Sequence, residues 1–108
     1  MISYNEFSKI ELAVAKIIDV TEIENSNKLY KLIVDVGEAQ TRTIIAGIKH
    51  YYKKEELIGK NIVIIINLEP RSLAGIQSQG MLLAAEDDLG NVVLLTPDKE
   101  IKPGSRIR

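Results

Sequence analysis

The chain has 108 residues, no cysteine and no tryptophan; 45% of its residues are apolar, 27% are charged, and its formal net charge is −1. This length fits one domain over residues 1–108 with a core of its own, and the apolar fraction is too high for a disordered chain. The missing cysteine excludes disulfides, thiolate nucleophiles and cysteine zinc sites. The near-neutral charge argues against nucleic-acid binding, because proteins that contact many phosphates are usually basic.

The first half of the chain predicts three consecutive strands after a lead-in turn at Tyr4–Ile10. The run Glu11–Ile23 is long and carries small residues midway, so we expect this strand to bend. Apolar residues alternate along Lys28–Val36, which predicts a second strand. Gly37–Glu38 suits a tight hairpin, and Gln40–Ala46 follows as the third strand.

In the second half of the chain, the spacing of apolar residues changes from that of a strand to that of a helix. Over Ile48–Leu57 this spacing predicts a short helix. The apolar run Asn61–Leu68 predicts a strand that is buried on both sides. Glu69–Gly80 is typical of a loop, and Met81–Ala85 predicts a fifth strand. We expect about residues 86–108 to form a strand-rich tail.

One helix between the third and fourth of five strands is the connection of the oligonucleotide/oligosaccharide-binding (OB) barrel. We therefore predict an all-β protein, a five-stranded OB-fold barrel over about residues 10–85 with a C-terminal extension over about residues 86–108. A small open sandwich is the alternative.

The chain offers little for catalysis. His50 is the single histidine and has no second histidine or cysteine to work with. The pairs Glu55–Glu56 and Asp87–Asp88 are adjacent in sequence, and neighbouring helix positions do not converge on one atom. Because no phosphate-binding glycine motif is present either, we predict no catalytic site, no metal site and no cofactor.

Binding is better supported, because OB barrels bind ligands across strands two and three and the flanking loops. Such a surface needs cations for phosphates and flat or apolar groups for bases. The cations near it are Lys28, Arg42, Lys49, Lys53, Lys54 and Arg71. Tyr30, Tyr51 and Tyr52 are candidates for base stacking, although Tyr30 shares its strand face with core residues. Arg42 is the most informative cation, since arginine can bind phosphate with two parallel hydrogen bonds.

The charge is unevenly distributed along the chain. Residues 1–41 hold 4 basic and 7 acidic residues, residues 42–81 hold 6 and 3, and residues 82–108 hold 4 and 5. The segment with the third strand, the helix and the loop before the fifth strand is therefore basic. This segregation removes the objection that the net charge raises against nucleic acid.

Many motifs recur in order along the chain. They are Lys28-Leu29-Tyr30, Val34–Gly37, Arg42-Thr43-Ile44, Ala46-Gly47-Ile48, Tyr51-Tyr52, Glu56–Lys60, Asn67–Arg71 and Ser78–Ala85. From about residue 6 to its end, the chain resembles the tRNA-binding domain at the C-terminus of methionyl-tRNA synthetases. The same domain occurs in cofactors of the endothelial-monocyte-activating-polypeptide type and as dimeric tRNA-binding proteins.

The resemblance implies a module that binds tRNA by shape and backbone, equivalent to a methionyl-tRNA synthetase beta subunit that raises tRNA affinity in aminoacylation. It implies a homodimer formed through about residues 86–108 and an association with the synthetase catalytic subunit. A cytoplasmic location is expected from the residues themselves, because the N-terminus shows no signal-peptide pattern and no segment is apolar enough to span a membrane. By position, the tRNA-facing residues are Lys28, Arg42, Lys49, Asn67, Arg71, Ser78, Gln79 and Met81. The four cations would neutralise phosphates. Asn67 and Ser78 would bond sugar or base edges, and Met81 would contact a base.

Two features depart from the family's pattern. Ala13 stands where relatives often carry an arginine, and Glu24–Asn27 stands in place of His-Pro-Asn-Ala-Asp. The family also contains small dimeric chaperones of bacterial secretion that share the barrel and tail. The alternative function is therefore a dimeric chaperone that holds unfolded clients, without a membrane span in either case.

Overall fold

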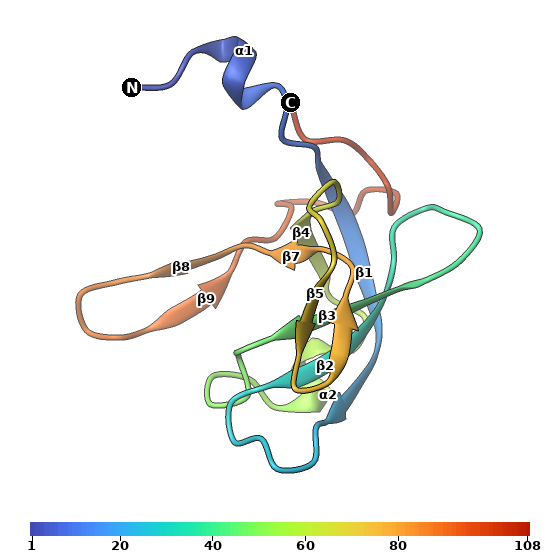
Figure 1. The fold of residues 1–108 in the computed structure, drawn as a ribbon, viewed down its shortest axis with the longest axis vertical. Coiled ribbons are helices and arrows are strands. Elements are labelled where there is room, and N and C mark those ends of the chain that lie inside the picture. The colour runs from blue at the N-terminus through green and yellow to red at the C-terminus, as the bar shows by residue number, and fades with distance from the viewer.

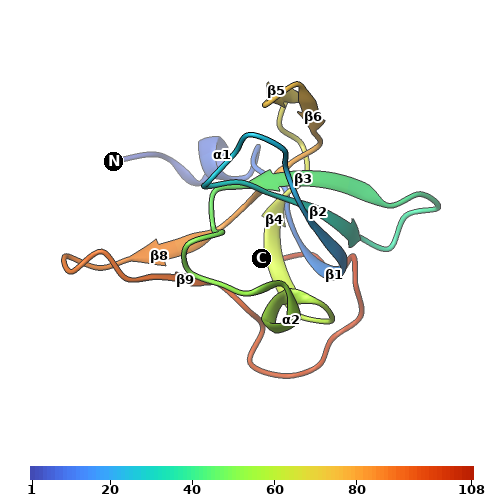
Figure 2. The ribbon, with the colours of Figure 1, turned by 90° about the horizontal axis from the view of Figure 1, so that it is seen from below.

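The computed structural model describes all 108 residues, and it shows an antiparallel barrel with two further hairpins (Figures 1 and 2). The five-stranded sheet has the order β3-β2-β1-β4-β7. Its strands are β1 (Leu12–Glu22), β2 (Tyr30–Asp35), β3 (Arg42–Ala46), β4 (Asn61–Ile65) and β7 (Met81–Leu82). The helix α2 (Lys54–Leu57) connects β3 to β4, and α1 (Tyr4–Phe7) precedes the barrel. This confirms the predicted all-β, five-stranded OB-fold barrel.

Two hairpins complete the element order. One pairs β5 (Arg71–Leu73) with β6 (Ile76–Ser78), and the other pairs β8 (Ala84–Glu86) with β9 (Val92–Leu94). The first lies against the barrel beside β3, and the second extends away from the barrel (Figure 1). The two helices, α1 and α2, have four residues each and are too short to span a membrane.

The long strand β1 serves both sides of the barrel, as its predicted bend requires. Its first half pairs with β4 and its second half pairs with β2, and the register shifts between Ile17 and Asp19. At such a register shift, one strand carries an extra residue relative to its partner, which bends the strand and increases its twist. Ala13 and Ala15 are buried in the half that pairs with β4.

The core fills the inside of the barrel and is almost entirely aliphatic. The largest fully buried side chains are Ile17, Leu32, Ile44, Leu57, Ile62 and Ile64. Leu57 comes from α2, so this one-turn helix contributes a side chain to the core. Beside it, the Gly59 N–H donates to the Ile17 carbonyl at 2.8 Å, which joins the exit of the helix to the bend of β1.

The barrel closes where the free edge of β3 meets Ser78 and Gln79. The Gln79 N–H donates to the Thr43 carbonyl at 2.8 Å, and the Thr43 N–H donates to the Gln79 side-chain oxygen at 2.8 Å. The Ile45 N–H donates to Ser78 Oγ at 3.0 Å. The side chains of Ser78 and Gln79 thus accept hydrogen bonds that the backbone carbonyls of a neighbouring strand would normally accept.

Gly80 makes this closure sterically possible. Its φ is +148°, and a Cβ there would lie 2.8 Å from the Ile65 carbonyl oxygen and 3.1 Å from Ile44 Cδ1. Only glycine tolerates both the backbone conformation and the close approach. The chain can therefore pass directly from the β3 edge to β7.

Two connections differ from the sequence-based expectations. The link between β2 and β3 spans residues 36–41 and is not a tight hairpin at Gly37–Glu38. Gly37 instead packs against the C-terminal tail, where a Cβ would lie 2.7 Å from the Pro103 carbonyl oxygen. The expected loop Glu69–Gly80 contains the β5–β6 hairpin, whose turn is Ala74–Gly75 with φ of 52° and 77°.

The strands β4 and β7 also differ from their predictions, since β4 ends at Ile65 and not at Leu68. β4 is fully buried on the core side only, since Ile62 and Ile64 are inaccessible while Val63 and Ile65 are half-buried. The predicted strand Met81–Ala85 is interrupted at Leu83. There the chain leaves β4 and begins to pair with β9.

The last residues return to the barrel. Gly104 donates to the Val14 carbonyl at 2.8 Å, Val14 donates to Ser105 at 2.9 Å, and Ile107 donates to Leu12 at 3.0 Å. The tail therefore lies along the edge of β1 that β2 leaves uncovered. A dimerisation role for residues 86–108 stays a prediction.

Replacing Ser78 by alanine should destabilise the fold by about 1–3 kcal/mol, because the buried Ile45 N–H loses its acceptor. Urea unfolding monitored by circular dichroism measures the change. Ser72, which is exposed on the same hairpin, supplies the control Ser72→Ala, with an expected change within about 0.5 kcal/mol. Equal effects of the two substitutions would contradict the role of Ser78 in closing the barrel.

Candidate nucleic-acid interface

Five of the eight candidate residues line the two pockets at the closure of the barrel, namely Arg42, Arg71, Ser78, Gln79 and Met81. Asn67 lies next in sequence to the pocket residues Ile66 and Leu68, but its side chain bonds to the segment before β1. Two pockets open here, a polar one of about 530 Å³ and a smaller, more apolar one of about 300 Å³, and Leu68 lines both. Lys28 and Lys49 lie together elsewhere, where the Lys49 N–H donates to the Lys28 carbonyl. The structure therefore divides the predicted site into two groups.

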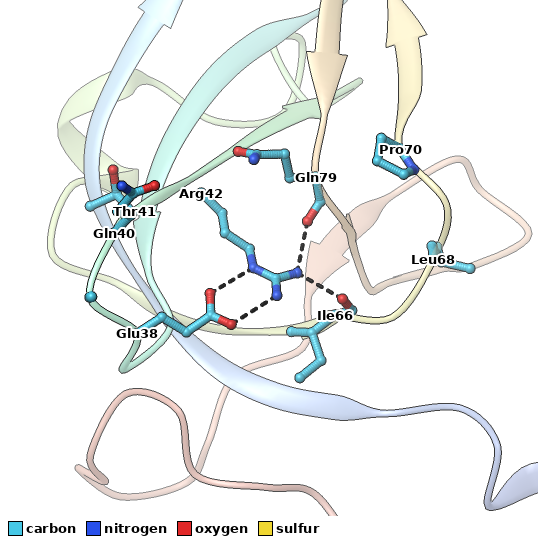
Figure 3. A pocket seen from close by; sticks show the side chains of 9 residues that line it. Glu38, Gln40, Thr41, Arg42, Ile66, Leu68, Pro70 and Gln79 are labelled. Atoms are coloured by element: carbon cyan, nitrogen blue, oxygen red, sulfur yellow. Dashed lines mark hydrogen bonds and ion pairs between the residues drawn. The ribbon is translucent and has the colours of Figure 1, made fainter.

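Arg42 lies in the polar pocket and uses its guanidinium within the chain (Figure 3). Nε and Nη2 donate to the two carboxylate oxygens of Glu38 at 2.8 and 2.9 Å. Nη1 donates to the carbonyls of Ile66 at 2.7 Å and Gln79 at 3.1 Å. Arg42 thus ties β3 to the exit of β4 and to the segment before β7.

The ion pair changes the titration of both partners. The hydrogen bond from Arg42 is the main cause that lowers the pKa of Glu38, and the hydrogen bond from Glu38 raises the pKa of Arg42. The carboxylate holds the paired N–H groups that would otherwise suit a phosphate. A phosphate would have to replace Glu38 to bind Arg42 with both bonds.

The predicted polar ligands also have partners within the chain. The Asn67 side chain donates to the Lys9 carbonyl at 2.7 Å and accepts from the Glu11 N–H at 2.8 Å, which fixes the segment before β1. Ser78, only 4% exposed, and Gln79 bond to β3 as described. These three residues shape the surface, and their contact with RNA stays a prediction.

Glu22 neutralises part of the second group. Lys49 Nζ lies 3.0 Å from one Glu22 oxygen and Lys54 Nζ lies 3.8 Å from the other. The hydrogen bond from Lys49 and then the charges of both lysines lower the pKa of Glu22. Lys28 is exposed next to this cluster and forms no ion pair.

Three candidates face solvent and form no side-chain hydrogen bond or ion pair, namely Lys28, Arg71 and Met81. Arg71 and Met81 line the apolar pocket together with Ile45 and Leu73. Lys28, Arg71 and Met81 are therefore the candidate residues most directly available to a ligand.

The tyrosines take different positions. Tyr30 is buried, as its strand face predicts, and its hydroxyl donates to the Tyr52 carbonyl at 2.9 Å. The Tyr52 hydroxyl accepts from the Leu94 N–H at 3.0 Å, so this ring anchors the β8–β9 hairpin. Tyr51 alone of the three is exposed and available for stacking.

Sequence reasoning missed two features of the site. It treated Glu38 as a turn residue, because a carboxylate four residues before an arginine indicates an ion pair only on a helix, and Glu38 lies in the link between β2 and β3. It also missed the apolar pocket, whose walls come from β3, the β5–β6 hairpin and β7. No group of three or more histidine, aspartate or glutamate side chains with metal-binding geometry lies in the structure.

The chain is similar in sequence to known proteins over almost its whole length. The chain is 54% identical over 107 residues to methionine–tRNA ligase of Thermococcus kodakarensis and 53% identical to that of Methanocaldococcus jannaschii. These matches cover 99% of the chain but only 14% and 16% of the ligases. The chain thus spans about one seventh of the curated relatives it matches, and it is homologous to their C-terminal region.

Solved structures give the same fold over the whole chain. A MetRS-related protein of Pyrococcus horikoshii is 37% identical with a TM-score of 0.93, covering 100% of this chain and 98% of that one. The CsaA chaperone protein of Picrophilus torridus is 38% identical with a TM-score of 0.90, and the coverage is 100% for both chains. The family model described as "Putative tRNA binding domain" matches residues 12–106. The chain therefore belongs to the tRNA-binding domain family that also forms the C-terminal region of methionyl-tRNA synthetases.

Proposed function

We propose that this domain binds tRNA without sequence specificity and catalyses no reaction of its own. The observation that carries this proposal is the surface around the barrel closure, which the basic segment 42–81 builds in a member of a tRNA-binding family. The chain is homologous to a region of the ligases outside any catalytic domain. The domain would therefore act on tRNA by binding alone.

We extend the proposal to the partner and the compartment. The matched ligases suggest that the domain raises the tRNA affinity of a methionyl-tRNA synthetase catalytic subunit in the cytoplasm. Tethering a weak tRNA-binding module to an enzyme raises the effective concentration of the tRNA at that enzyme. The structural neighbours that are chaperones make client binding the competing function.

The mechanism we propose relies on exposed cations around a rigid surface. Lys28 and Arg71 contact phosphates directly, because neither has to give up an ion pair first. Lys49 and Arg42 join only if the phosphate competes with Glu22 and Glu38. The internal bonds of Asn67 hold the surface in place, so little ordering is needed when RNA binds.

Binding of bulk tRNA should weaken linearly on a plot of log affinity against log salt, because each phosphate contact releases counterions. Lys28→Gln and Arg71→Gln should each reduce the slope by about 0.7 to 0.9. Filter binding over a salt series measures both. The exposed Lys16, outside both groups, provides the control Lys16→Gln with an unchanged slope.

No tRNA binding at low salt, or a flat salt dependence, would contradict this function. Suppressed aggregation of an unfolded client that tRNA does not compete against would favour the chaperone alternative instead.

Glu38→Gln tests whether Arg42 contacts phosphate. Removing the competing carboxylate should raise tRNA affinity about two- to fivefold if the guanidinium is a ligand, a gain typical of one exposed ion pair. Competition binding at fixed salt measures the change. Glu24→Gln makes the same charge change at an exposed residue and is the control. An affinity that falls below that of the control would assign Arg42 to the fold alone.

The β8–β9 hairpin supports the homodimer that we propose through the C-terminal extension. The hairpin extends from the barrel (Figure 1), and Leu89, Val93 and Leu95 are 83%, 55% and 39% exposed. Apolar side chains grouped on a protruding ribbon favour a protein interface. A second copy of this domain would bury them.

Val93→Asp should convert the dimer to a monomer, because a charge would be buried in the interface. Sedimentation velocity measures the oligomeric state. Ile58, which is similarly exposed beside α2, gives the control Ile58→Asp, expected to stay dimeric. Truncation after Glu86 is a poorer test, because it also removes the C-terminal residues that bond to β1. A monomeric wild type would disprove the dimer.

A further inference from the structure

The C-terminal extension divides into two parts of opposite charge. Residues 86–98 hold 4 acidic residues and no basic one, whereas residues 99–108 hold 4 basic residues and 1 acidic one. The turn of the β8–β9 hairpin belongs to the first part and points to the left in Figure 1, away from the barrel. The final segment, residues 99–108, is drawn in red and lies on the other side, beside β1. The homodimer proposed above uses the hairpin and leaves the basic final segment without a role.

The final segment is fixed to the barrel through its backbone. The Val14 N–H donates to the Ser105 carbonyl at 2.9 Å, and the Gly104 N–H donates to the Val14 carbonyl at 2.8 Å. Gly104 has a φ of +90°, and a Cβ there would lie 2.6 Å from the Val36 carbonyl oxygen. Only glycine therefore lets the segment approach the chain after β2 so closely. The cations of the final segment thus project from a fixed backbone.

A pocket of about 400 Å³ opens between the final segment and the link from β2 to β3. Lys102 and Arg106 line it from the final segment, and Glu38 lines it from the link. Glu38 and Ile66 also line the polar pocket that holds Arg42, so the two pockets adjoin. The hydrogen bond from Arg42 is the main cause that lowers the pKa of Glu38, and the charges of Arg42 and Arg106 add to it. The surface at the barrel closure therefore continues to the final segment.

Both cations of this pocket have donors without a partner in the chain. Lys102 is exposed and forms no ion pair or side-chain hydrogen bond. Arg106 donates only through Nη1, to Glu11 Oε1 at 2.8 Å, so its Nε and Nη2 are free. Nε and Nη2 are the same two donors that Arg42 gives to Glu38. Arg106 can therefore offer a phosphate the edge that Arg42 has already used.

We propose that Lys102 and Arg106 bind the tRNA backbone as a further group of phosphate contacts on the final segment. The inference rests on the tRNA-binding function proposed above and extends the bound surface beyond the barrel closure. The free edge of the Arg106 guanidinium fits two phosphate oxygens with parallel hydrogen bonds, and Lys102 adds a point charge. A chain of linked phosphates can occupy both adjoining pockets at once, whereas one acidic side chain occupies only one. The continuity of the surface thus favours RNA over an acidic peptide.

Lysine footprinting on the wild-type protein locates the contact. Acetylation by an amine-reactive ester, read by mass spectrometry, should slow severalfold at Lys102 when tRNA is bound, because a phosphate covers Nζ. Lys99 is the internal control, since it is exposed on the same segment but lines a different pocket beside Asn61. A Lys102 that reacts equally with and without bound tRNA would overturn the proposal. So would a Lys102 that is already unreactive in the free protein, because a second copy would then cover the segment.

The salt dependence of tRNA binding counts the phosphate contacts. Lys102→Gln and Arg106→Gln should each reduce the slope of log affinity against log salt by about 0.7 to 0.9, while Lys99→Gln leaves it unchanged. Wild-type slopes in both variants, with tRNA still bound, would overturn this inference and leave the proposed function standing. A wild-type protein that binds no tRNA would overturn both.

Glu11→Gln separates a ligand from a purely structural Arg106. It removes the ion pair but keeps the cation, so tRNA affinity should rise about two- to fivefold relative to the control Glu24→Gln, a gain typical of one exposed ion pair. If Arg106 only held the final segment against β1, Glu11→Gln would weaken binding as Arg106→Gln does, and the proposal would be wrong. Polyglutamate that protects Lys102 from acetylation while tRNA does not would assign this surface to an acidic protein and also overturn it.

Discussion

The free edge of β3 is the constraint on which the rest of this barrel depends. A five-stranded sheet that curls on itself still leaves unpaired N–H groups on its last strand, and burying them without partners costs free energy. Here Ser78 and Gln79 supply side-chain oxygens to Ile45 and Thr43, and Gly80 permits the close approach. Closure therefore depends on three consecutive residues and not on a long sixth strand.

This closure also determines what is left to bind a ligand. Some residues have the side-chain types of a tRNA ligand but use their hydrogen bonds within the fold. Arg42 joins β3 to the exit of β4, and Asn67 holds the N-terminal segment. The side chains that remain unpaired, Arg71 and Met81, lie on the surface that those bonds support. The fold and the site thus share residues, and a substitution that disturbs one disturbs the other.

Most of the fold follows from the sequence because it depends on local patterns. Alternation along β2, the small residues of β1 and the change of period before α2 each report a property of neighbouring positions. The Ala74–Gly75 hairpin was missed, since alanine seldom adopts a positive φ and the usual asparagine is absent. The pairing of Arg42 with Glu38 depends on the path of the link between β2 and β3, and the pairing of the tail with β1 joins residues far apart in sequence, so no periodic pattern predicts either one.

Folding also revises the electrostatic argument. The cations of the basic segment 42–81 are segregated along the sequence, yet in space Arg42 pairs with Glu38, and Lys49 and Lys54 share Glu22. Both glutamates come from residues 1–41, so folding places acidic side chains next to the cations of the basic segment. Lys60 lies 5.9 Å from the centre of the Tyr52 ring, which leaves few cations unengaged. Because these few cations can neutralise only a few phosphates, a firm hold on tRNA needs surface shape and apolar contact as well.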